Sequence, residues 1–308
     1  MVQHKGEKGS SVRSPGSRVL TVVNATLAIV LLATWASVFV VKGIIGATAW
    51  GLAILILAPL GAVLILASLT FLIVGVSRHK PVAQRAITLV LTCILAIPLL
   101  TLLNFAPMAY PATAGNTHPS LTIVSPFKRD VVVGSGGDNI RTNASHLIWA
   151  SERWAYDLVA DPYDTGSEKL QDFGIYGLDV CSPVEGTVIA AHDGEPDITP
   201  NTEEFSSLAG NYVYLRVKVD DADAYLLLAH LKNGSVKVAA GDSVAVGDHL
   251  AQVGNSGTSS EPHLHMHLQR QNPTKTLYPV FAEGLPLYFS DRAGGRTLPS
   301  AGAVLGHQ

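Results

Sequence analysis

The sequence carries little charge and almost no cysteine. Charged residues make up 15% of its 308 positions and the net charge is −3 at pH 7. The basic surface that is typical of nucleic-acid-binding proteins is therefore missing, and we expect no nucleic-acid partner. Cys93 lies within a long apolar run and Cys181 lies far downstream, so the two cannot pair. We interpret Cys181 as a small apolar strand residue and not as a reactive thiol.

Apolar residues, by contrast, are abundant and are gathered in the first third of the chain. Three runs contain no charged residue, and they cover 19–41, 49–76 and 86–106. Each reaches about the 20 residues that a helix needs to cross a bilayer core. None shows the polar stripe that is usual for helices of a soluble core. The first run also exceeds the roughly 7–15 apolar residues of a cleaved signal peptide. We predict a membrane-embedded α-helical region over 19–106 with three transmembrane helices, the first of them an uncleaved anchor.

Basic residues around these runs predict their orientation. The N-terminal tail, 1–18, and the loop 77–85 contain several lysines and arginines, whereas the loop after the first run holds only Lys42. Cytoplasmic loops carry the excess of basic residues, so we place the tail and the second loop in the cytoplasm. The chain is then a multi-pass protein of the cytoplasmic membrane. Its part after residue 107 is expected on the extracytoplasmic side.

Beyond residue 120 the helical pattern gives way to short strands. NYVYLRVKV, AYLLLAHL and HLHMHLQR are rich in β-branched and aromatic residues, and turn signals such as KNGS and GNSG bound them. This spacing favours an antiparallel sheet over alternating strands and helices. We predict a linker over 107–119, a mainly-β antiparallel domain over 120–288 and a flexible tail over 289–308.

Histidine occupies every second position of PHLHMHL, residues 262–268. Alternate side chains of a strand share one face, so His263, His265 and His267 are expected to point the same way. Imidazole is the commonest metal ligand and the side chain that titrates nearest neutral pH. Taken alone, the pattern fits a metal or catalytic site and a solvated strand face about equally well.

Four motifs, in order and spacing, resemble those of the lysostaphin-like (LytM-type) zinc metallopeptidases. They are SPVEGTVIAAHDG, GNYVYLR, LLAHL and GDSVAVGDHLAQVGNSGTSSEPHLHMHL. The resemblance covers 120–285 and implies a compact antiparallel β domain with a groove. It also implies that His265 is a zinc ligand, that His263 is a catalytic histidine and that His230 is the catalytic partner of His263. It assigns no role to His267, which we interpret as a strand residue.

The first motif departs from this family, whose usual form is His-x-Gly-x-Asp. The sequence keeps Asp157, an implied metal ligand, but has Arg153 where the family has a histidine. Arginine stays protonated in proteins and cannot ligate zinc. We predict His146 as the replacement ligand, brought beside Asp157 by a hairpin between 143–149 and 153–159. An incomplete site, with His146 an ordinary exposed residue, is the alternative.

A catalytic zinc keeps three protein ligands and one open position. The resemblance thus implies a membrane-anchored zinc metalloendopeptidase that acts on peptidoglycan peptides outside the cytoplasmic membrane. The alternative is a catalytically degenerate LytM-type domain that binds cell wall or regulates another wall hydrolase. The presence of Asp157, His230, His263 and His265 favours the enzyme. Asn143 has two interpretations, because it either closes a turn or, as in some family members, blocks the zinc.

Overall fold

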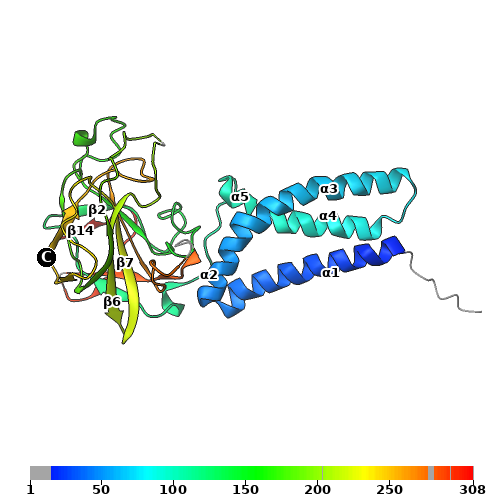
Figure 1. Cartoon of the computed structure of the whole chain (residues 1–308), viewed down its shortest axis with the longest axis horizontal. Helices are drawn as coiled ribbons and strands as arrows, with labels where there is room; N and C mark the ends of the chain where they lie inside the picture. The colour runs from blue at the N-terminus through cyan, green and yellow to red at the C-terminus, as the bar shows by residue number, and fades with distance from the viewer. Residues whose placement is uncertain (1–14, 203, 277–280, 292, 308) are drawn as a thin grey trace, which may run out of the picture.

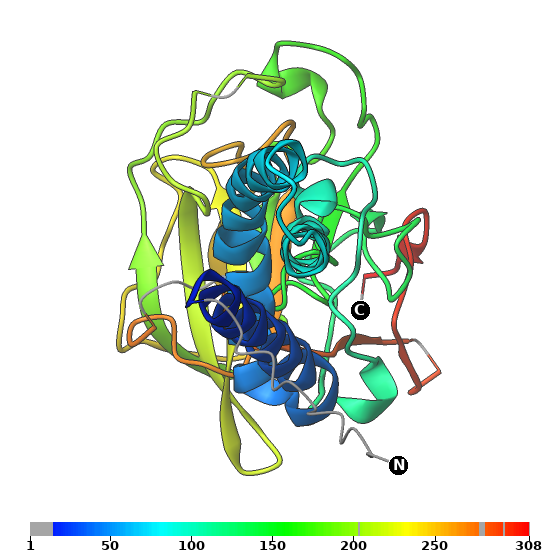
Figure 2. The same ribbon diagram turned by 90° about the vertical axis from the view of Figure 1, so that its right-hand side faces the viewer.

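A bundle of helices and a β-rich domain make up the chain (Figure 1). The computed structural model describes residues 15–202, 204–276, 281–291 and 293–307. Residues 1–14 of the predicted cytoplasmic tail lie outside the described residues. Figure 2, viewed from the helical end, shows the helices in front of the β-rich domain.

Three helical segments are long and apolar enough to cross a membrane: Gly16–Val41, Gly43–Ser77 and Ala83–Leu102. The first two contain short π-helical turns, and the third is interrupted at Pro98, whose ring cannot continue an α-helix without a kink. Their elements are α1 (Pro15–Ala36), η1 (Ser37–Val41), α2 (Gly43–Leu52), η2 (Ala53–Leu57), α3 (Ala58–Ser77), α4 (Ala83–Ala96) and α5 (Leu99–Leu102).

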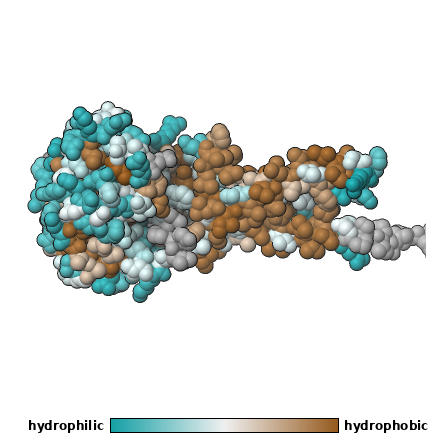
Figure 3. Space-filling model, turned by 45° about the horizontal axis from the view of Figure 1, so that its top comes forward, coloured by the Kyte–Doolittle hydropathy of each residue, from teal (hydrophilic) through white to brown (hydrophobic). Residues whose placement is uncertain are grey.

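The helical bundle presents an apolar surface. Figure 3 shows this surface next to the largely hydrophilic β-rich domain. Many valine, leucine and isoleucine side chains along the helices are exposed. An exposed apolar surface of this extent is unusual for a soluble protein and suggests membrane anchoring.

Between α1 and α4, the buried Asn24 donates to the side chain of Gln84 at 2.9 Å and accepts from Thr88 at 2.7 Å. Such polar contacts hold apolar helices together in one arrangement.

The β-rich domain is built on a nine-stranded sheet. Its strand order is β14-β2-β3-β10-β7-β6-β5-β8, with β11 paired to β10. All strand pairs in this sheet are antiparallel, and in the described residues only β1 and β12, in a second sheet, are parallel. The predicted fold class, apolar helices followed by a mainly antiparallel sheet domain, is therefore confirmed.

The strands and the two short 3-10 turns have the following bounds. They are η3 (Ala114–Asn116), β1 (Leu121–Ile123), β2 (Val131–Ser135), β3 (Tyr156–Val159), η4 (Leu170–Asp172), β4 (Asp179–Cys181), β5 (Gly186–His192), β6 (Asn211–Val219), β7 (Ala222–Leu231), β8 (Ser243–Val244), β9 (His249–Gln252), β10 (Leu264–Gln269), β11 (Gly284–Leu285), β12 (Leu287–Ser290), β13 (Arg296–Thr297) and β14 (Val304–Leu305).

Strand β10 explains the alternating histidines. Leu264, Met266 and Leu268 are at most 1% exposed and belong to the main hydrophobic core. Because successive side chains of a strand point to opposite faces, His265 and His267 are directed to the other face of the sheet. The core therefore fixes which face of β10 carries the imidazoles.

The segment predicted as a flexible tail, 289–308, instead contains strands. β14 pairs with β2, where Val304 lies opposite Val132 and Leu305 opposite Val131, and the Leu305 side chain is buried. The segment is rich in glycine and polar residues, which hides the short apolar stretch that pairs with the sheet edge.

The hairpin predicted between 143–149 and 153–159 does not form. Residues 144–154 run as successive turns and bends, and β3 pairs with β2 and β10. The turns are closed by local bonds: the backbone N–H of His146 donates to Asn143 at 3.2 Å and that of Trp149 to His146 at 2.9 Å. These local bonds occupy backbone groups that a hairpin ladder would have needed.

Candidate metal centre

The sheet places Asp157 and His265 side by side. They are cross-strand partners in the β3–β10 pair, so their side chains share one face. His265 Nδ1 lies 3.0 Å from Asp157 Oδ1. Two segments more than a hundred residues apart in sequence thus meet through strand register alone.

His146 reaches the same carboxylate from the turn segment. Its Nε2 lies 3.2 Å from Asp157 Oδ2, and its side chain is only 7% exposed. His146, Asp157 and His265 each offer an atom within 4.8 Å of the others, an arrangement that could hold a metal ion. The structure therefore brings the three predicted ligands together, although by a turn and not by the expected hairpin.

Arg153, which stands at the family's histidine position, has other partners. Its Nε donates to the Tyr110 carbonyl at 3.0 Å, and its Nη2 lies 2.5 Å from the carboxylate of Asp138. The buried guanidinium thus fastens the segment after the last apolar helix to the β-rich domain.

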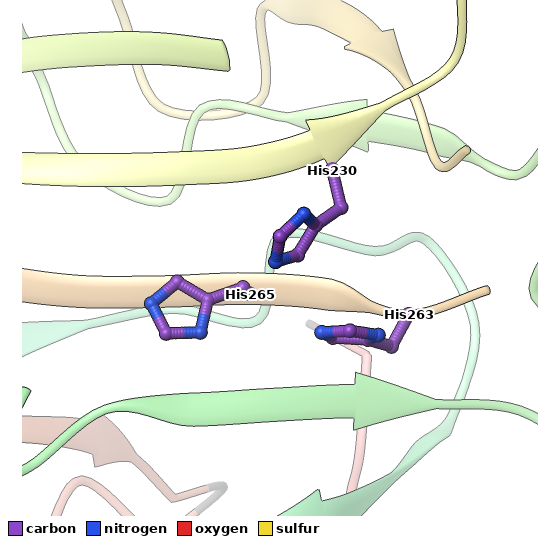
Figure 4. A group of neighbouring side chains, drawn as sticks. All are labelled: His230, His263 and His265. Atoms are coloured by element: carbon purple, nitrogen blue, oxygen red, sulfur yellow. The ribbon is translucent and has the colours of Figure 1, made fainter. Parts of the chain in front are cut away.

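The two predicted catalytic histidines face the same centre (Figure 4). His263 Nε2 lies 3.4 Å from Asp157 Oδ1. The ring centroids of His230 and His263 are 4.7 Å apart, and those of His230 and His265 are 5.7 Å apart. All five predicted site residues therefore border one small volume.

His230 is aimed by an irregularity near the end of β7. The register with β6 shifts here, and His230 has a φ of +60°, a left-handed conformation that costs a non-glycine residue about 1–3 kcal/mol. Its Nδ1 donates to the Ser256 carbonyl at 2.8 Å. The next residue, Gly257, packs directly against the backbone of Gly210, because a Cβ on Gly257 would lie 2.3 Å from the Gly210 nitrogen. The GNSG motif is thus explained by the close approach of two backbones.

Hydrogen bonds donated by Nδ1 orient three of the imidazoles. His146 Nδ1 donates to Asn143 Oδ1 at 2.7 Å, and His263 Nδ1 donates to the Glu261 carbonyl at 2.8 Å, as His230 does to Ser256. Asn143 Oδ1 must be the acceptor, because Nδ2 of Asn143 donates to two backbone carbonyls. With the proton on Nδ1, each neutral ring turns an Nε2 lone pair towards Asp157 or the neighbouring rings.

A series of hydrogen bonds from Gln269 through His267 places the proton of His265 on Nε2 and not on Nδ1. Gln269 Nε2 donates to the Gln271 carbonyl, so Gln269 Oε1 accepts from His267 Nε2 at 3.2 Å. His267 Nδ1 then accepts from His265 Nε2 at 3.0 Å. Burial, followed by repulsion from His265, lowers the pKa of His267 to about 3, which keeps this ring neutral. His265 is left with a free Nδ1 lone pair that faces Asp157.

With these tautomers, three ring nitrogens that carry lone pairs lie within 3.0–3.4 Å of the carboxylate oxygens of Asp157. They are His146 Nε2, His263 Nε2 and His265 Nδ1. Such an arrangement is repulsive unless a positive charge, a proton or a metal ion, lies among them. Burial alone would raise the pKa of Asp157, but the positive charge of His146, and then that of His263 when these rings are protonated, holds it well below its usual range. A carboxylate and neutral imidazoles are the ligands that zinc accepts, so the donor set fits that metal.

The centre lies in a cavity of about 510 Å³. Apolar walls are formed by Leu208, Tyr214 and Leu227, with Trp149 on the side of the turn segment. The volume is within the range of about 300–1,000 Å³ that is usual for ligand pockets. The cavity therefore offers room for a substrate segment beside the imidazoles.

Residues 174–276 match the sequence model of Peptidase family M23. This part of the chain is similar to the M23 peptidases. The match includes His230, His263 and His265 and begins after His146 and Asp157. The boundary agrees with the motifs, because the resemblance is strong around the later histidines and departs from the family form at the first motif. The family expected from the sequence is confirmed.

The proteins that resemble this chain include several that are named as peptidases or proteases. A protein named "Uncharacterized metalloprotease" from Buchnera aphidicola subsp. Baizongia pistaciae (strain Bp) is 33% identical over 101 residues, 32% of this chain and 24% of the relative. Lysostaphin from Staphylococcus simulans is 17% identical, with 50% of this chain and 47% of that chain covered and a TM-score of 0.31. A zinc-containing peptidase from Vibrio cholerae is 19% identical, with 52% and 42% covered and a TM-score of 0.30. The match spans about a quarter of the curated relative and less than half of either solved structure.

Two residues at this centre have roles that the sequence analysis missed or left open. His267, interpreted above as a strand residue, fixes the tautomer of His265, and its place in the alternating pattern was the signal available. Asn143 orients His146 and also accepts from Ser135 at 3.0 Å, and it makes no blocking contact with Asp157 among the described contacts. Asn143 is therefore part of the turn, the first of its two interpretations.

Proposed function

We propose that this chain is a membrane-anchored, zinc-dependent metalloendopeptidase that hydrolyses peptide bonds of peptidoglycan outside the cytoplasmic membrane. The observation that carries the proposal is the convergence of His146, Asp157 and His265 on one centre that His230 and His263 also face. The match of residues 174–276 to Peptidase family M23 supports the reaction type. The cell-wall substrate follows from the resemblance to lysostaphin-like enzymes together with the expected outward orientation.

In this proposal His146, Asp157 and His265 hold the metal. Bound zinc would supply Lewis-acid chemistry, because it polarises the scissile carbonyl and acidifies water. The three donors leave a fourth position open, as catalytic zinc sites do. Asn143 and His267 orient His146 and His265, as hydrogen-bonded outer partners of metal-binding histidines usually do.

His230 and His263 would carry the proton transfers. Burial, followed by repulsion from neighbouring imidazoles, lowers the pKa of His230 well below its usual range. Burial also lowers the pKa of His263, against the attraction of Asp157. Both rings are therefore neutral near pH 7, and their Nε2 atoms can accept a proton from water. Once protonated, either ring can donate to the oxyanion that develops on the scissile carbonyl or to the leaving amine.

Digestion of purified cell walls tests this function. Full-length protein in detergent, loaded with zinc, is expected to release new amino termini from peptidoglycan sacculi. A zinc chelator should stop the release, and added zinc should restore it. Binding to sacculi without any new amino termini would contradict the enzyme and favour a degenerate domain that binds cell wall.

The outward orientation has its own test. A reporter enzyme that is active only outside the cytoplasm is expected to be active when fused after Gln308. The same reporter fused after Lys80, in the predicted cytoplasmic loop, is expected to be inactive, because basic loops stay in the cytoplasm. The reverse pattern would contradict the topology and, with it, the assignment of a cell-wall substrate.

A further inference from the structure

The turn segment that carries His146 is held from the side of the apolar helices. The Ile148 carbonyl accepts a hydrogen bond from the indole Nε1 of Trp50, on α2, at 2.6 Å. The Leu147 carbonyl accepts from the backbone N–H of Tyr110 at 2.7 Å. The two residues that directly follow His146 are thus each bonded to a part of the chain outside the β-rich domain's sheet.

Packing reinforces these two bonds. Trp50 and Tyr110 are 3% and 4% exposed, and their rings meet edge to face with centroids 5.8 Å apart. Ala150 belongs to the same buried cluster, together with Val38, Ala47 and Ile54 of the helical region. A tryptophan with both an apolar contact and a satisfied N–H is a well-defined anchor. The helical region and the turn segment therefore share one small core.

The other two donors of the centre do not depend on these helices. Asp157 and His265 lie on β3 and β10, and register within the main sheet fixes their separation. Residues 144–154 have no strand pairing. They are held by the bonds to Trp50 and Tyr110, by local turns and by a bond from the Gly284 N–H to the Ala150 carbonyl at 2.8 Å. Side-chain bonds of His146 to Asn143, of Ser145 to Ser135 and of Arg153 to Tyr110 and Asp138 add to these. Of the three donors, His146 is the one whose segment is also bonded to α2, while Asn143 fixes the direction of its ring.

We propose that Trp50 is a positioning residue for the metal centre, so that α2 forms a structural part of the site by holding the turn that carries His146. This inference rests on the proposed function, because it requires His146 to be a metal ligand. Metal–ligand distances are tolerated within about 0.2 Å, so a small displacement of the turn weakens the His146 bond. Movement of α2 then changes the metal affinity while Asp157 and His265 stay in place.

The test uses the full-length protein in detergent and compares two substitutions. Trp50→Phe keeps an aromatic ring in the shared core but removes the N–H that bonds Ile148. Trp35→Phe is the matched control, since the Trp35 ring lies 6.2 Å from that of Trp50 and its indole has no hydrogen bond in the described part of the chain. Zinc affinity is measured by competition with a chelator. The visible absorption of the cobalt-substituted protein reports the ligand geometry.

Trp50→Phe is expected to weaken zinc binding roughly 10-fold, at the lower end of the 10–100-fold cost of losing an outer partner. It should also change the cobalt spectrum, whereas Trp35→Phe should leave both unchanged. Replacement of Trp50 by benzothienylalanine, which keeps the ring shape and lacks the N–H, is expected to match Trp50→Phe. This second variant provides the comparison if the phenylalanine variant does not fold.

Unchanged affinity and spectrum in both Trp50 variants would overturn the inference while leaving the proposed function intact. An equal loss in Trp35→Phe would also overturn it, because the effect would then be general packing of the core. Failure of the wild-type protein itself to bind zinc would instead remove the proposed function, and the inference with it.

Discussion

Alanine in place of Asp157, His146 or His265 is expected to abolish stoichiometric zinc binding and cleavage together. The reason is electrostatic and geometric. Asp157 presents both carboxylate oxygens to the imidazoles, with Oδ2 3.2 Å from His146 and Oδ1 3.0 Å from His265. Loss of the anion leaves only neutral lone pairs, and loss of either ring leaves two donors where a catalytic zinc requires three. The affinity should fall by more than the roughly 10–100-fold that is typical for an outer partner.

The measurement is zinc content of full-length variants after dialysis. His249→Ala is the control, because His249 also pairs with a carboxylate, Asp179 at 3.4 Å, but on the exposed surface. That variant should retain zinc. Wild-type zinc affinity in His146→Ala would show that His146 is not a ligand. It would then favour the alternative interpretation from the sequence, in which the site is incomplete.

Alanine at His263 or His230 is expected to separate metal binding from catalysis. Each variant should retain zinc, because neither residue belongs to the proposed ligand set. Cleavage should fall by about 10²–10⁴-fold, the usual contribution of general acid–base catalysis.

Zinc content and cleavage rate are measured on the same preparations, again with His249→Ala as the control. Loss of metal in His263→Ala, together with retention in His265→Ala, would reverse the two assignments. This test matters because His230, His263 and His265 also offer ligand atoms within 4.8 Å of one another and form a second group that could hold a metal ion.

Local patterns in the sequence were sufficient for the fold class. Alternation in β10 is imposed by a core that requires Leu264, Met266 and Leu268 on one face, so the histidines had to occupy the other. The three apolar helices could be predicted without tertiary information, because their length and lack of charge can be read directly from the sequence. The β14 strand was missed, since two apolar residues in a glycine-rich stretch give no periodic signal.

Contacts between distant segments could not be predicted in the same way. Trp50 and Ile148 are 98 positions apart, and no spacing rule links an apolar helix to a turn of another domain. His146 was chosen for its closeness in sequence to Asp157, but the turn that delivers it depends on Asn143 and on backbone bonds that sequence does not reveal. The tautomer of His265 depends on His267 and Gln269, which became evident only with their distances.

The most direct test of the account is the zinc-to-protein ratio of the purified wild-type chain. Full-length protein in detergent, stripped of metal and then dialysed against limiting zinc, is measured by elemental analysis beside Asp157→Ala. The account predicts about one zinc per wild-type chain, as three converging ligands with an open position require, and almost none in the variant. A wild-type chain without zinc, or an Asp157→Ala chain with as much zinc as the wild type, would contradict it.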